Sequence, residues 1–471
     1  MVRAGERIHV IGIAGAGAAG TALLAARAGA VVDGCDAAGP SSYSAPLTGE
    51  GVSVVTGHDA AHLEGVDRVA VSAALRLVPD LPELAAARER GIEVVAWQAL
   101  LGELMGEGSH LGVAVAGTHG KSTATALLGH LLVAAGHDPT VEVGAFIPAW
   151  GASVRAGGGV EFLAEADEYD GNFLHLHTAA VLLTTIEMDH PDVFANEDAV
   201  YDMFARFLRG MGTDARVGGR LLVAPAGDAG TDAVLYRLGD WEGRIVRYGP
   251  GTDAEATAVT FTPEGTTFTL LGQEYTSPLA GAYNVHNAVG ALIMGQELGI
   301  GPEALQEALA GFRGASRRLE LIADTAGVLV FDDYAHHPTE VRAALAGARQ
   351  RVGGRRLWAV IEPHTYARTR AMFDEYAAAF RTADEVVVAD VFAARDPDTT
   401  IVTSERLADA IEEVSAVPAI ATGDIHQTAA YVADHVRAGD AVVTLGIGSS
   451  HKIAAGIAQA LSAHPAGETS R

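Results

Sequence analysis

A lysine and two hydroxyl-bearing residues follow a glycine-bounded turn, in a pattern suited to phosphate chemistry. The segment G-T-H-G-K-S-T at 117–123 comes after a short apolar run at 113–116. The run predicts a buried strand, and the alanine-rich stretch after the turn predicts a helix. Backbone N–H groups at a helix start attract anions, Lys121 could reach the β- and γ-phosphates, and Ser122 could ligate Mg²⁺. The predicted phosphate-binding loop consists of Gly117, Thr118, His119, Gly120, Lys121, Ser122 and Thr123.

Lysine usage supports this prediction. Lys121 and Lys452 are the only lysines among the 32 basic residues of the chain, and the others are arginines. A planar guanidinium is a poor substitute for a compact ammonium among phosphate oxygens. The strict G-x-x-x-x-G-K-[ST] pattern is not met, because Val115 stands where its first glycine would be. The alternative is a tight strand-to-helix turn with a solvated lysine.

Two acidic clusters follow predicted strands at 161–164 and 179–186. The first, E-A-D-E-Y-D, begins at Glu165, and the second, E-M-D-H-P-D, contains His190. The carboxyl ends of parallel strands lie at one edge of a sheet, where ligands bind, and the phosphate loop shares that edge. Mg²⁺ prefers carboxylates and can accept a histidine when phosphates complete its shell. We therefore expect Glu165 and His190 to contact Mg²⁺ together with Ser122; the alternative is that the acids only cap helices.

A polar helix start and a basic connector are further candidates. Asn284 and Asn287 could hydrogen-bond a nucleobase or ribose, or could serve as ordinary helix caps. Arg313, Arg317 and Arg318 lie in a connector and could close on phosphates bound by another domain. A solvated interdomain surface is the alternative for these arginines.

Histidine-containing motifs follow two strands in the last third of the chain. They are D-D-Y-A-H-H-P at 332–338 and E-P-H-T-Y-A-R-T-R at 362–370. Adjacent residues on an extended backbone point in opposite directions. We therefore expect one of His336 and His337 to face a ligand and the other to pack.

A glycine-rich turn with Gly12, Gly15 and Gly17 follows the first predicted strand. A helix and a second strand at 30–34 come next, and Asp36 follows them. This βαβ pattern with an acidic residue after the second strand would fit NAD, FAD or a nucleotide diphosphate.

Composition limits the classes of function. The chain has 471 residues, of which 49% are apolar, and this suits about three α/β domains. A net charge of −27 opposes binding to nucleic acid or anionic membranes. The single cysteine, Cys35, indicates a reducing compartment, and we find no signal peptide. No uncharged apolar stretch is long enough to span a membrane, so we expect a cytoplasmic protein.

Polar breaks divide the chain into three α/β domains. We expect a Rossmann-like domain at 1–108, a central P-loop ATPase domain at 109–315 and a second Rossmann-like domain at 316–471. The central sheet should be mostly parallel, with an antiparallel hairpin at 256–280. Strands predicted in the last domain lie at 328–332, 357–361, 385–390, 418–421 and 441–445.

Taken in order, these motifs resemble those of the Mur ligases. The matching segments are G-T-H-G-K-S-T, E-A-D-E-x-D, D-H-P-D, N-x-x-N-A, R-R-L-E, D-D-Y-A-H-H-P-T-E and P-H-x-Y-x-R-T-R. The resemblance implies a UDP-substrate domain, an ATPase domain and an amino-acid domain. It also implies a reaction of peptidoglycan precursor synthesis, in which ATP phosphorylates a substrate carboxylate and an amine attacks the acyl phosphate.

The central domain has no lysine after Lys121, and this distinguishes between the subgroups of the Mur ligases. Members for later steps resemble one another in a carbamylated lysine of the central domain that helps to hold Mg²⁺. This chain has no lysine between Lys121 and Lys452. The resemblance therefore implies the branch whose substrates are UDP-N-acetylmuramate and L-alanine.

The resemblance also implies roles for individual residues. Lys121 would contact the β- and γ-phosphates, Ser122 and Glu165 would hold one Mg²⁺, and His190 would ligate a second. Asn287 would touch the adenosine. The residues expected to line the amino-acid side are Asp333, Tyr334, His336, His364 and Arg368. Expected catalytic residues are Lys121, Glu165, His190, Arg317, Arg318, Asp333, His336 and Arg368. Further nucleotide contacts are expected from Asn284 and, at the UDP pyrophosphate, from Gly12, Gly15 and Gly17.

Three positions depart from the family pattern. Tyr283 replaces a usual histidine, and Thr365 and Trp97 replace usual arginines. The alternatives are a related ligase that joins a peptide or another amino acid to UDP-N-acetylmuramate, and a nonenzymatic nucleotide-dependent scaffold. A nicotinamide oxidoreductase would explain the glycine turn and Asp36, but it leaves Lys121 and the acidic clusters unexplained.

Overall fold

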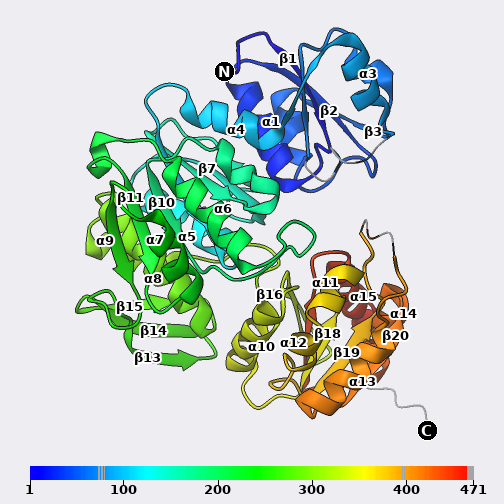
Figure 1. Ribbon diagram of the computed structural model, residues 1–471. Coiled ribbons are helices and arrows are strands. Elements are labelled where there is room, and N and C mark those ends of the chain that lie inside the picture. The colour runs from blue at the N-terminus through cyan, green and yellow to red at the C-terminus, as the bar shows by residue number, and fades with distance from the viewer. Residues whose placement is uncertain (73–74, 76–77, 79, 395, 397, 464–471) are drawn as a thin grey trace.

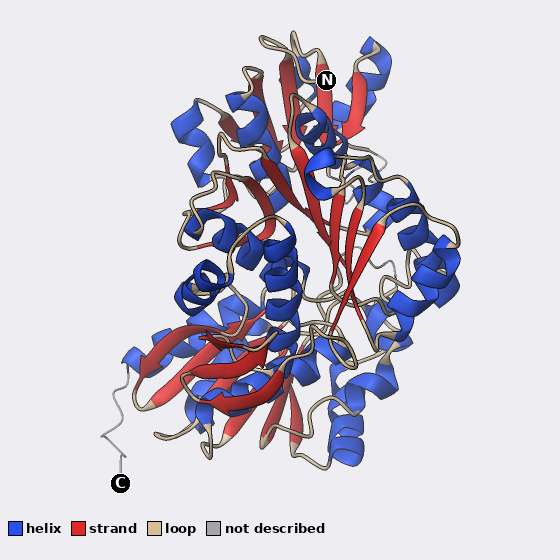
Figure 2. Ribbon diagram, turned by 90° about the vertical axis from the view of Figure 1, so that its left-hand side faces the viewer, coloured by secondary structure: helices blue, strands red, loops and turns tan. Residues whose placement is uncertain are grey.

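The computed structural model describes residues 1–72, 75, 78, 80–394, 396 and 398–463. Figure 1 shows three α/β units in chain order, coloured blue, cyan to green, and yellow to red. Helices flank the sheet of each unit, as the view in Figure 2 shows. The α/β class with three units, predicted from the sequence, is confirmed.

The N-terminal unit has a parallel sheet in the order β3-β2-β1-β4-β5. Its strands are β1 (Arg7–Ile11), β2 (Val31–Asp36), β3 (Ser53–Thr56), β4 (Arg68–Val71) and β5 (Glu93–Ala96). Its helices are α1 (Ala16–Arg27), η1 (Ala45–Glu50), η2 (Ala60–Leu63), α3 (Pro82–Arg90) and α4 (Trp97–Gly106). Val10 packs with α1 and α4 on one face, whereas Ile11 and Cys35 pack with η2 and α3 on the other.

The central unit has a seven-stranded sheet in the order β12-β11-β10-β6-β9-β7-β8. Its strands are β6 (Leu111–Ala116), β7 (Thr140–Ile147), β8 (Ala152–Arg155), β9 (Glu161–Ala166), β10 (Ala180–Leu183), β11 (Leu221–Pro225) and β12 (Arg244–Tyr248). Within this sheet β8 pairs antiparallel with β7, and the other pairs are parallel. Every residue of β6 is buried, as expected for a parallel strand covered on both faces.

Helices cover both faces of the central sheet. They are α5 (Lys121–Ala134), η3 (Tyr169–His175), α6 (Glu197–Arg209), η4 (Ala215–Val217), α7 (Ala229–Leu238), α8 (Ala282–Glu297) and α9 (Pro302–Gly311). The core with α5, α8 and α9 lies on one face, and the core with α6 and α7 lies on the other. The phosphate loop thus stands where a fully covered strand enters a buried helix.

The predicted antiparallel hairpin is present and has a third strand. The strands are β13 (Thr257–Thr262), β14 (Gly265–Leu270) and β15 (Gln273–Ser277). Gln350 of the C-terminal unit donates to the carbonyl oxygens of Thr262 and Gly265 at 2.9 and 2.8 Å. The small sheet therefore connects the central unit with the C-terminal one.

The C-terminal unit has a sheet in the order β16-β17-β21-β18-β19-β20. Its strands are β16 (Glu320–Thr325), β17 (Val328–Asp333), β18 (Leu357–Ile361), β19 (Glu385–Ala389), β20 (Ala419–Gly423) and β21 (Ala441–Leu445). Its helices are α10 (Pro338–Val352), α11 (Tyr366–Ala371), α12 (Phe373–Ala377), α13 (Ser404–Ser415), α14 (Ile425–His435) and α15 (Ser450–Ala463). Among the described residues, no helix of the molecule is both long and apolar enough to cross a membrane.

Some predicted strands were too short or missing. The strand predicted at 161–164 continues to Ala166, because Val115 of β6 pairs with Glu165 and extends the ladder. The strand predicted at 30–34 continues to Asp36. The sixth C-terminal strand, β16, was not predicted; it pairs antiparallel with β17 across a turn in which Ala326 has a φ of 52°.

The central core provides a test of this packing. Leu182 in β10 is fully buried, and Leu182→Ala should lower the free energy of unfolding by about 2–5 kcal/mol, because it leaves a cavity. Leu271→Ala, at a turn where the leucine is 46% exposed, is the matched control. It should change that free energy by less than about 0.5 kcal/mol. Urea unfolding followed by circular dichroism measures both, and equal losses would contradict this account of the core.

Candidate active site

The phosphate loop joins β6 to α5, and its shape requires two glycines. Gly117 and Gly120 have φ values of 137° and 81°, in a region that favours glycine. A Cβ atom on Gly117 would lie 2.1 Å from Thr184 Oγ1, and one on Gly120 would lie 2.3 Å from Asn287 Oδ1. Conformation and close neighbours therefore both exclude side chains at these positions.

The ammonium group of Lys121 is folded over this loop. Its Nζ donates to the carbonyl oxygens of Gly117 at 2.6 Å and Thr118 at 3.1 Å, and to Glu168 Oε2 at 2.8 Å. Burial opposes the charge, but the carboxylates of Glu168 and Asp167 raise the lysine pKa, so the ammonium stays protonated. The second carboxylate oxygen of Glu168, Oε1, is buried without a hydrogen-bond partner among the described residues.

Ser122 and Glu165 lie in contact, which is the pairing expected of a Mg²⁺ site. Ser122 Oγ donates to Glu165 Oε1 at 2.9 Å, and the N–H of Gly144 donates to Glu165 Oε2 at 2.7 Å. Burial and the charges of Glu165 and Asp167 raise the pKa of Glu142 well above its usual value. A divalent cation would relieve this repulsion, and oxygen donors of this kind are those that Mg²⁺ prefers. The residues present therefore fit a magnesium ion.

His190, the third predicted metal contact, lies beside the partner of Lys121. Its Nε2 is 3.7 Å from Glu168 Oε1 and 3.7 Å from Asp189 Oδ2. Its φ of 53° is unusual for a residue with a side chain and is typical of functional turns. The contacts of His190 are thus different from those of the Ser122–Glu165 pair, in keeping with a second cation position.

An ion pair between units lies next to His190. Arg368 of α11 donates to Asp189 Oδ1 from Nε at 3.1 Å and from Nη2 at 2.8 Å. Both side chains are buried. Although burial opposes the negative charge, the guanidinium holds the pKa of Asp189 well below its usual range. Arg368 Nη1 also lies 3.2 Å from His364 Nδ1, so this pair orders part of the expected amino-acid side.

His119 of the phosphate loop forms a second connection between the units. Its Nδ1 lies 3.0 Å from Glu340 Oε1, and its Nε2 is bonded to Glu187 Oε1. Burial alone would lower the pKa of this histidine, but the charges of Glu340 and Glu187 raise it to about 10. His119 is therefore an imidazolium at neutral pH, and it joins a central acid to the first turn of α10.

The two consecutive arginines of the connector have different surroundings. Arg318 Nη2 donates to Ser122 Oγ at 3.1 Å, so this guanidinium reaches the phosphate loop. Arg317 Nε instead donates to Asp332 Oδ2 at 2.8 Å, and its Nη2 donates to the carbonyl oxygen of Gly446 at 2.6 Å. The structure therefore brings Arg318 to the other site residues and places Arg317 in contacts within the C-terminal unit. Arg313 is exposed.

Burial shifts the pKa values of titratable groups in the two histidine-containing motifs of the C-terminal unit. Asp333 accepts hydrogen bonds from the N–H groups of Leu319 and Ala335 at 2.7 and 2.8 Å, and burial raises its pKa to about 6. Burial lowers the pKa of His336 to about 4 and that of His364 to about 3. Both imidazoles are therefore neutral at neutral pH.

His336 and His337 contact different neighbours. His337 is the N-cap of α10, and its Nδ1 accepts the N–H of Thr339 at 3.2 Å. The ring of His336 lies 6.1 Å from that of His364, centroid to centroid. Contact of either ring with a ligand stays a prediction.

The two asparagines are not the caps of α8, because Gly281 occupies the N-cap position. Asn284 Nδ2 donates to the carbonyl oxygen of Ala280 at 2.8 Å. Asn287 lies against Gly120 of the phosphate loop. The capping alternative is therefore wrong, and Asn287 is placed beside the loop; its contact with a nucleotide stays a prediction.

The glycine turn of the N-terminal unit lies at the start of α1. Gly12 has a φ of 80° and donates its N–H to the carbonyl oxygen of Cys35 at 2.8 Å. Gly15 is the N-cap of α1. A Cβ atom on Gly17 would lie 2.2 Å from the indole of Trp97. The tryptophan that replaces a usual arginine therefore packs directly on this turn.

Four acids of the site were not singled out from the sequence. Glu168, Glu187 and Asp189 stand inside the two predicted acidic clusters, and Glu340 ends the D-D-Y-A-H-H-P-T-E motif. The acidic clusters were therefore recognisable from the sequence. The positively charged side chain that each acid contacts was not. Those partners lie on other elements, such as Arg368 of α11.

Family models and curated relatives match most of the chain. The Mur ligase family catalytic domain matches residues 7–108, the Mur ligase middle domain matches 115–295, and the Mur ligase glutamate ligase domain matches 317–448. A UDP-N-acetylmuramate–L-alanine ligase of Clavibacter sepedonicus is 41% identical, covering 86% of this chain and 84% of its own. A relative of the same name from Gloeobacter violaceus is 37% identical, covering 86% and 85%. The chain belongs to the Mur ligase family.

Solved structures share the arrangement of the three units. The UDP-N-acetylmuramate-alanine ligase MurC of Thermotoga maritima has a TM-score of 0.80 at 23% identity, covering 96% of this chain and 98% of that one. The murein peptide ligase of Psychrobacter arcticus has a TM-score of 0.71 at 26% identity, covering 97% and 99%.

The charge of His119 makes the connection between units dependent on pH. With a pKa of about 10 against an ordinary 6.5, its stabilisation is complete below the ordinary value and is lost as the pH rises through about 10. Between pH 7 and 10 the melting temperature should therefore fall more steeply in the wild type than in His119→Gln. His435→Gln, at an exposed histidine, should keep the wild-type slope. Thermal melts across this range test the expectation, and equal slopes for wild type and His119→Gln would refute it.

Proposed function

We propose that this chain is an ATP-dependent ligase that joins L-alanine to the carboxylate of UDP-N-acetylmuramate. Relatives with that activity in their names support the substrate pair. One observation carries the proposal: the phosphate loop meets the D-D-Y-A-H-H-P-T-E motif through His119–Glu340 and the R-R-L-E motif through Arg318–Ser122, in one site. Since ATP is a cytoplasmic cosubstrate, the proposed activity belongs in the cytoplasm.

ATP would bind with its phosphates on the loop at 117–123. The loop N–H groups and the start of α5 favour phosphate oxygens, and these oxygens would compete with Glu168 for the ammonium of Lys121. Asn287 lies beside the loop and would contact the nucleoside. Mg²⁺ held by Ser122 and Glu165 would neutralise phosphate charge and support transfer of the γ-phosphoryl group.

The proposed reaction has two steps. The substrate carboxylate attacks the γ-phosphorus, ADP leaves and an acyl phosphate forms; the amine of L-alanine then attacks the acyl carbon, and phosphate leaves. Two anions must approach each other in the first step, so fixed positive charge is needed there. Arg318, hydrogen-bonded to Ser122, and Lys121, hydrogen-bonded to Gly117, would supply that charge at the loop.

The amino acid would bind against the C-terminal motifs. His336 and His364 are neutral at neutral pH, since burial lowers their pKa values to about 4 and 3. The Nδ1 of His336 faces the carbonyl oxygen of Tyr334 and so carries the ring proton, which leaves Nε2 to accept a hydrogen bond from the attacking amine. The Nδ1 of His364 instead accepts from Arg368, so its Nε2 is a donor. Arg368, held in place by Asp189, provides a positive charge for the carboxylate of the amino acid.

The substrate pair can be tested with a screen for phosphate release. The full chain is incubated with ATP, Mg²⁺, UDP-N-acetylmuramate and, one at a time, each amino acid or the tripeptide of the cell wall. We expect phosphate release with L-alanine that requires the sugar acid. Release with the peptide and not with L-alanine would favour the activity in the name of the Psychrobacter arcticus relative. ATP hydrolysis that ignores both cosubstrates would overturn the ligase proposal.

The two lysines of the chain provide a matched pair of variants. Lys121→Ala should lower kcat by at least about 100-fold, because it removes a charge that stabilises the transferring phosphoryl group. Lys452→Ala, at an exposed position of α15, should leave kcat within about twofold, since surface changes away from the site are mild. Steady-state assays on folded variants measure both. Retention of kcat in Lys121→Ala would contradict the role of this lysine.

A further inference from the structure

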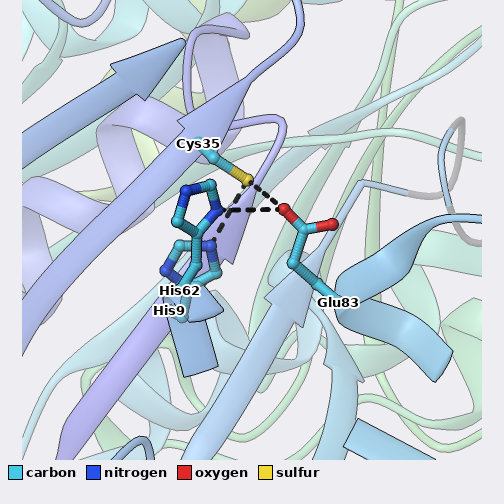
Figure 3. A group of neighbouring side chains, drawn as sticks. All are labelled: His9, Cys35, His62 and Glu83. Carbon is cyan, nitrogen blue, oxygen red and sulfur yellow. Dashed lines mark hydrogen bonds and ion pairs between the residues drawn. The ribbon is translucent and has the colours of Figure 1, made fainter. Parts of the chain in front are cut away.

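The N-terminal unit contains a cluster of potential metal ligands away from the phosphate loop. His9 of β1, Cys35 of β2, His62 of η2 and Glu83 of α3 each contribute one ligand atom, and these atoms lie within 4.8 Å of one another. In Figure 3 the sulfur and the carboxylate point toward each other, with the two imidazole rings beside them. His9, Cys35 and Glu83 are each at most 1% exposed. Four elements thus direct N, S and O donors into one buried place.

The distances between these donors resemble the edges of a coordination tetrahedron. Cys35 Sγ is 3.3 Å from His9 Nε2 and 3.2 Å from Glu83 Oε1, and His62 Nδ1 is 3.1 Å from the same oxygen. Donors bound tetrahedrally to one Zn²⁺ at about 2.0–2.3 Å lie about 3.3–3.8 Å apart. Small adjustments of the side chains would therefore place all four donors around one ion. His58 Nδ1, 3.4 Å from Cys35 Sγ, lies beside them.

The first histidine is oriented by a carboxylate. His9 Nδ1 lies 2.6 Å from Asp33 Oδ1, and a carboxylate at that distance holds the ring proton on Nδ1. The lone pair of Nε2 then points toward Cys35 Sγ. A carboxylate behind a histidine in this way is the usual support of a metal-binding imidazole.

The carboxylate of Glu83 has one oxygen that accepts no hydrogen bond from the described residues. Its side chain is fully buried. Its Oε1 accepts the N–H of Asp59 at 3.0 Å, while Oε2 has no hydrogen-bond partner within the described part of the chain. A buried carboxylate with an unpaired oxygen is costly unless a positive charge is close. A divalent cation would balance both the carboxylate of Glu83 and a thiolate at Cys35.

We propose that His9, Cys35, His62 and Glu83 bind one Zn²⁺ ion as a structural site. Thiolate and imidazole donors favour Zn²⁺, a borderline-soft ion, over Mg²⁺, which prefers oxygen ligands. On binding, the thiol of Cys35 releases its proton to solvent, and the two anionic ligands cancel the charge of the ion. The site is separate from the Mg²⁺ position at Ser122 and Glu165, and it does not depend on the proposed ligase activity.

The ion would stabilise the turn that follows β1. The carbonyl oxygen of Cys35 accepts the N–H groups of Gly12 and Ile13 at 2.8 and 3.2 Å. Cys35 is therefore the point at which the metal ligands and the glycine turn share one backbone segment. Zinc would join η2 and α3 to the sheet directly behind that turn.

Cobalt provides a specific probe, because Cys35 is the only cysteine of the chain. The full-length protein is stripped of metal with a chelator and titrated with Co²⁺ in excess Mg²⁺. We expect a thiolate-to-cobalt charge-transfer band that saturates at one equivalent and is removed by Zn²⁺. Cys35→Ser should abolish the band, and His435→Gln, at an exposed histidine, should retain it.

A second variant keeps the test valid if Cys35→Ser does not fold. The carboxylate of Asp33 is 43% exposed, and Asp33→Asn should weaken Zn²⁺ binding by about 10- to 100-fold, as loss of an orienting partner does. Zn²⁺ should also raise the melting temperature of the wild type more than that of Asp33→Asn. Absence of the band in the wild type would show that the cluster is only a network of hydrogen bonds.

Discussion

A buried ammonium group among carboxylates is the interaction on which the candidate active site depends. Lys121 can be buried because Glu168 and the carbonyl oxygens of its own loop accept hydrogen bonds from its ammonium group. The loop can take that shape because Gly117 and Gly120 have no side chains to meet Thr184 and Asn287. The arrangement maintains a positive charge at the end of a fully covered strand. The ammonium group can then replace its carboxylate partner by a phosphate group.

Contacts between units convert this loop into a site for two further substrates. His119 reaches Glu340, Arg318 reaches Ser122, and Arg368 reaches Asp189. Each pair joins the carboxyl edge of the central sheet to the C-terminal unit; Arg368 and Asp189 are buried, and the other two pairs are partly buried. Because buried charges are costly without partners, the relative position of these two units is coupled to the charge states of the residues that would handle the acid and the amine.

Much of this fold could be predicted from the sequence, because buried parallel strands leave continuous apolar runs. The strands at 357–361 and 441–445 have the predicted limits. The edge strand β16 was missed, since half-exposed strands carry no such run. Ser122 and Glu165 were expected together, and they are in contact because Glu165 lies near the end of β9 and Ser122 follows β6, its neighbour in the sheet. The inward contacts of Arg317 were not foreseen: its partner Asp332 and the carbonyl oxygen of Gly446 come together only in the folded unit.

The central claim is that the loop at 117–123 holds the triphosphate and that Lys121 changes partners to do so. A crystal structure with a non-hydrolysable ATP analogue and Mg²⁺ tests this most directly. The account predicts phosphate oxygens at the loop N–H groups, the ammonium of Lys121 moved from Glu168 to the β- and γ-phosphates, and a cation between Ser122 and Glu165. A nucleotide bound elsewhere, with the Lys121–Glu168 pair intact, would contradict it.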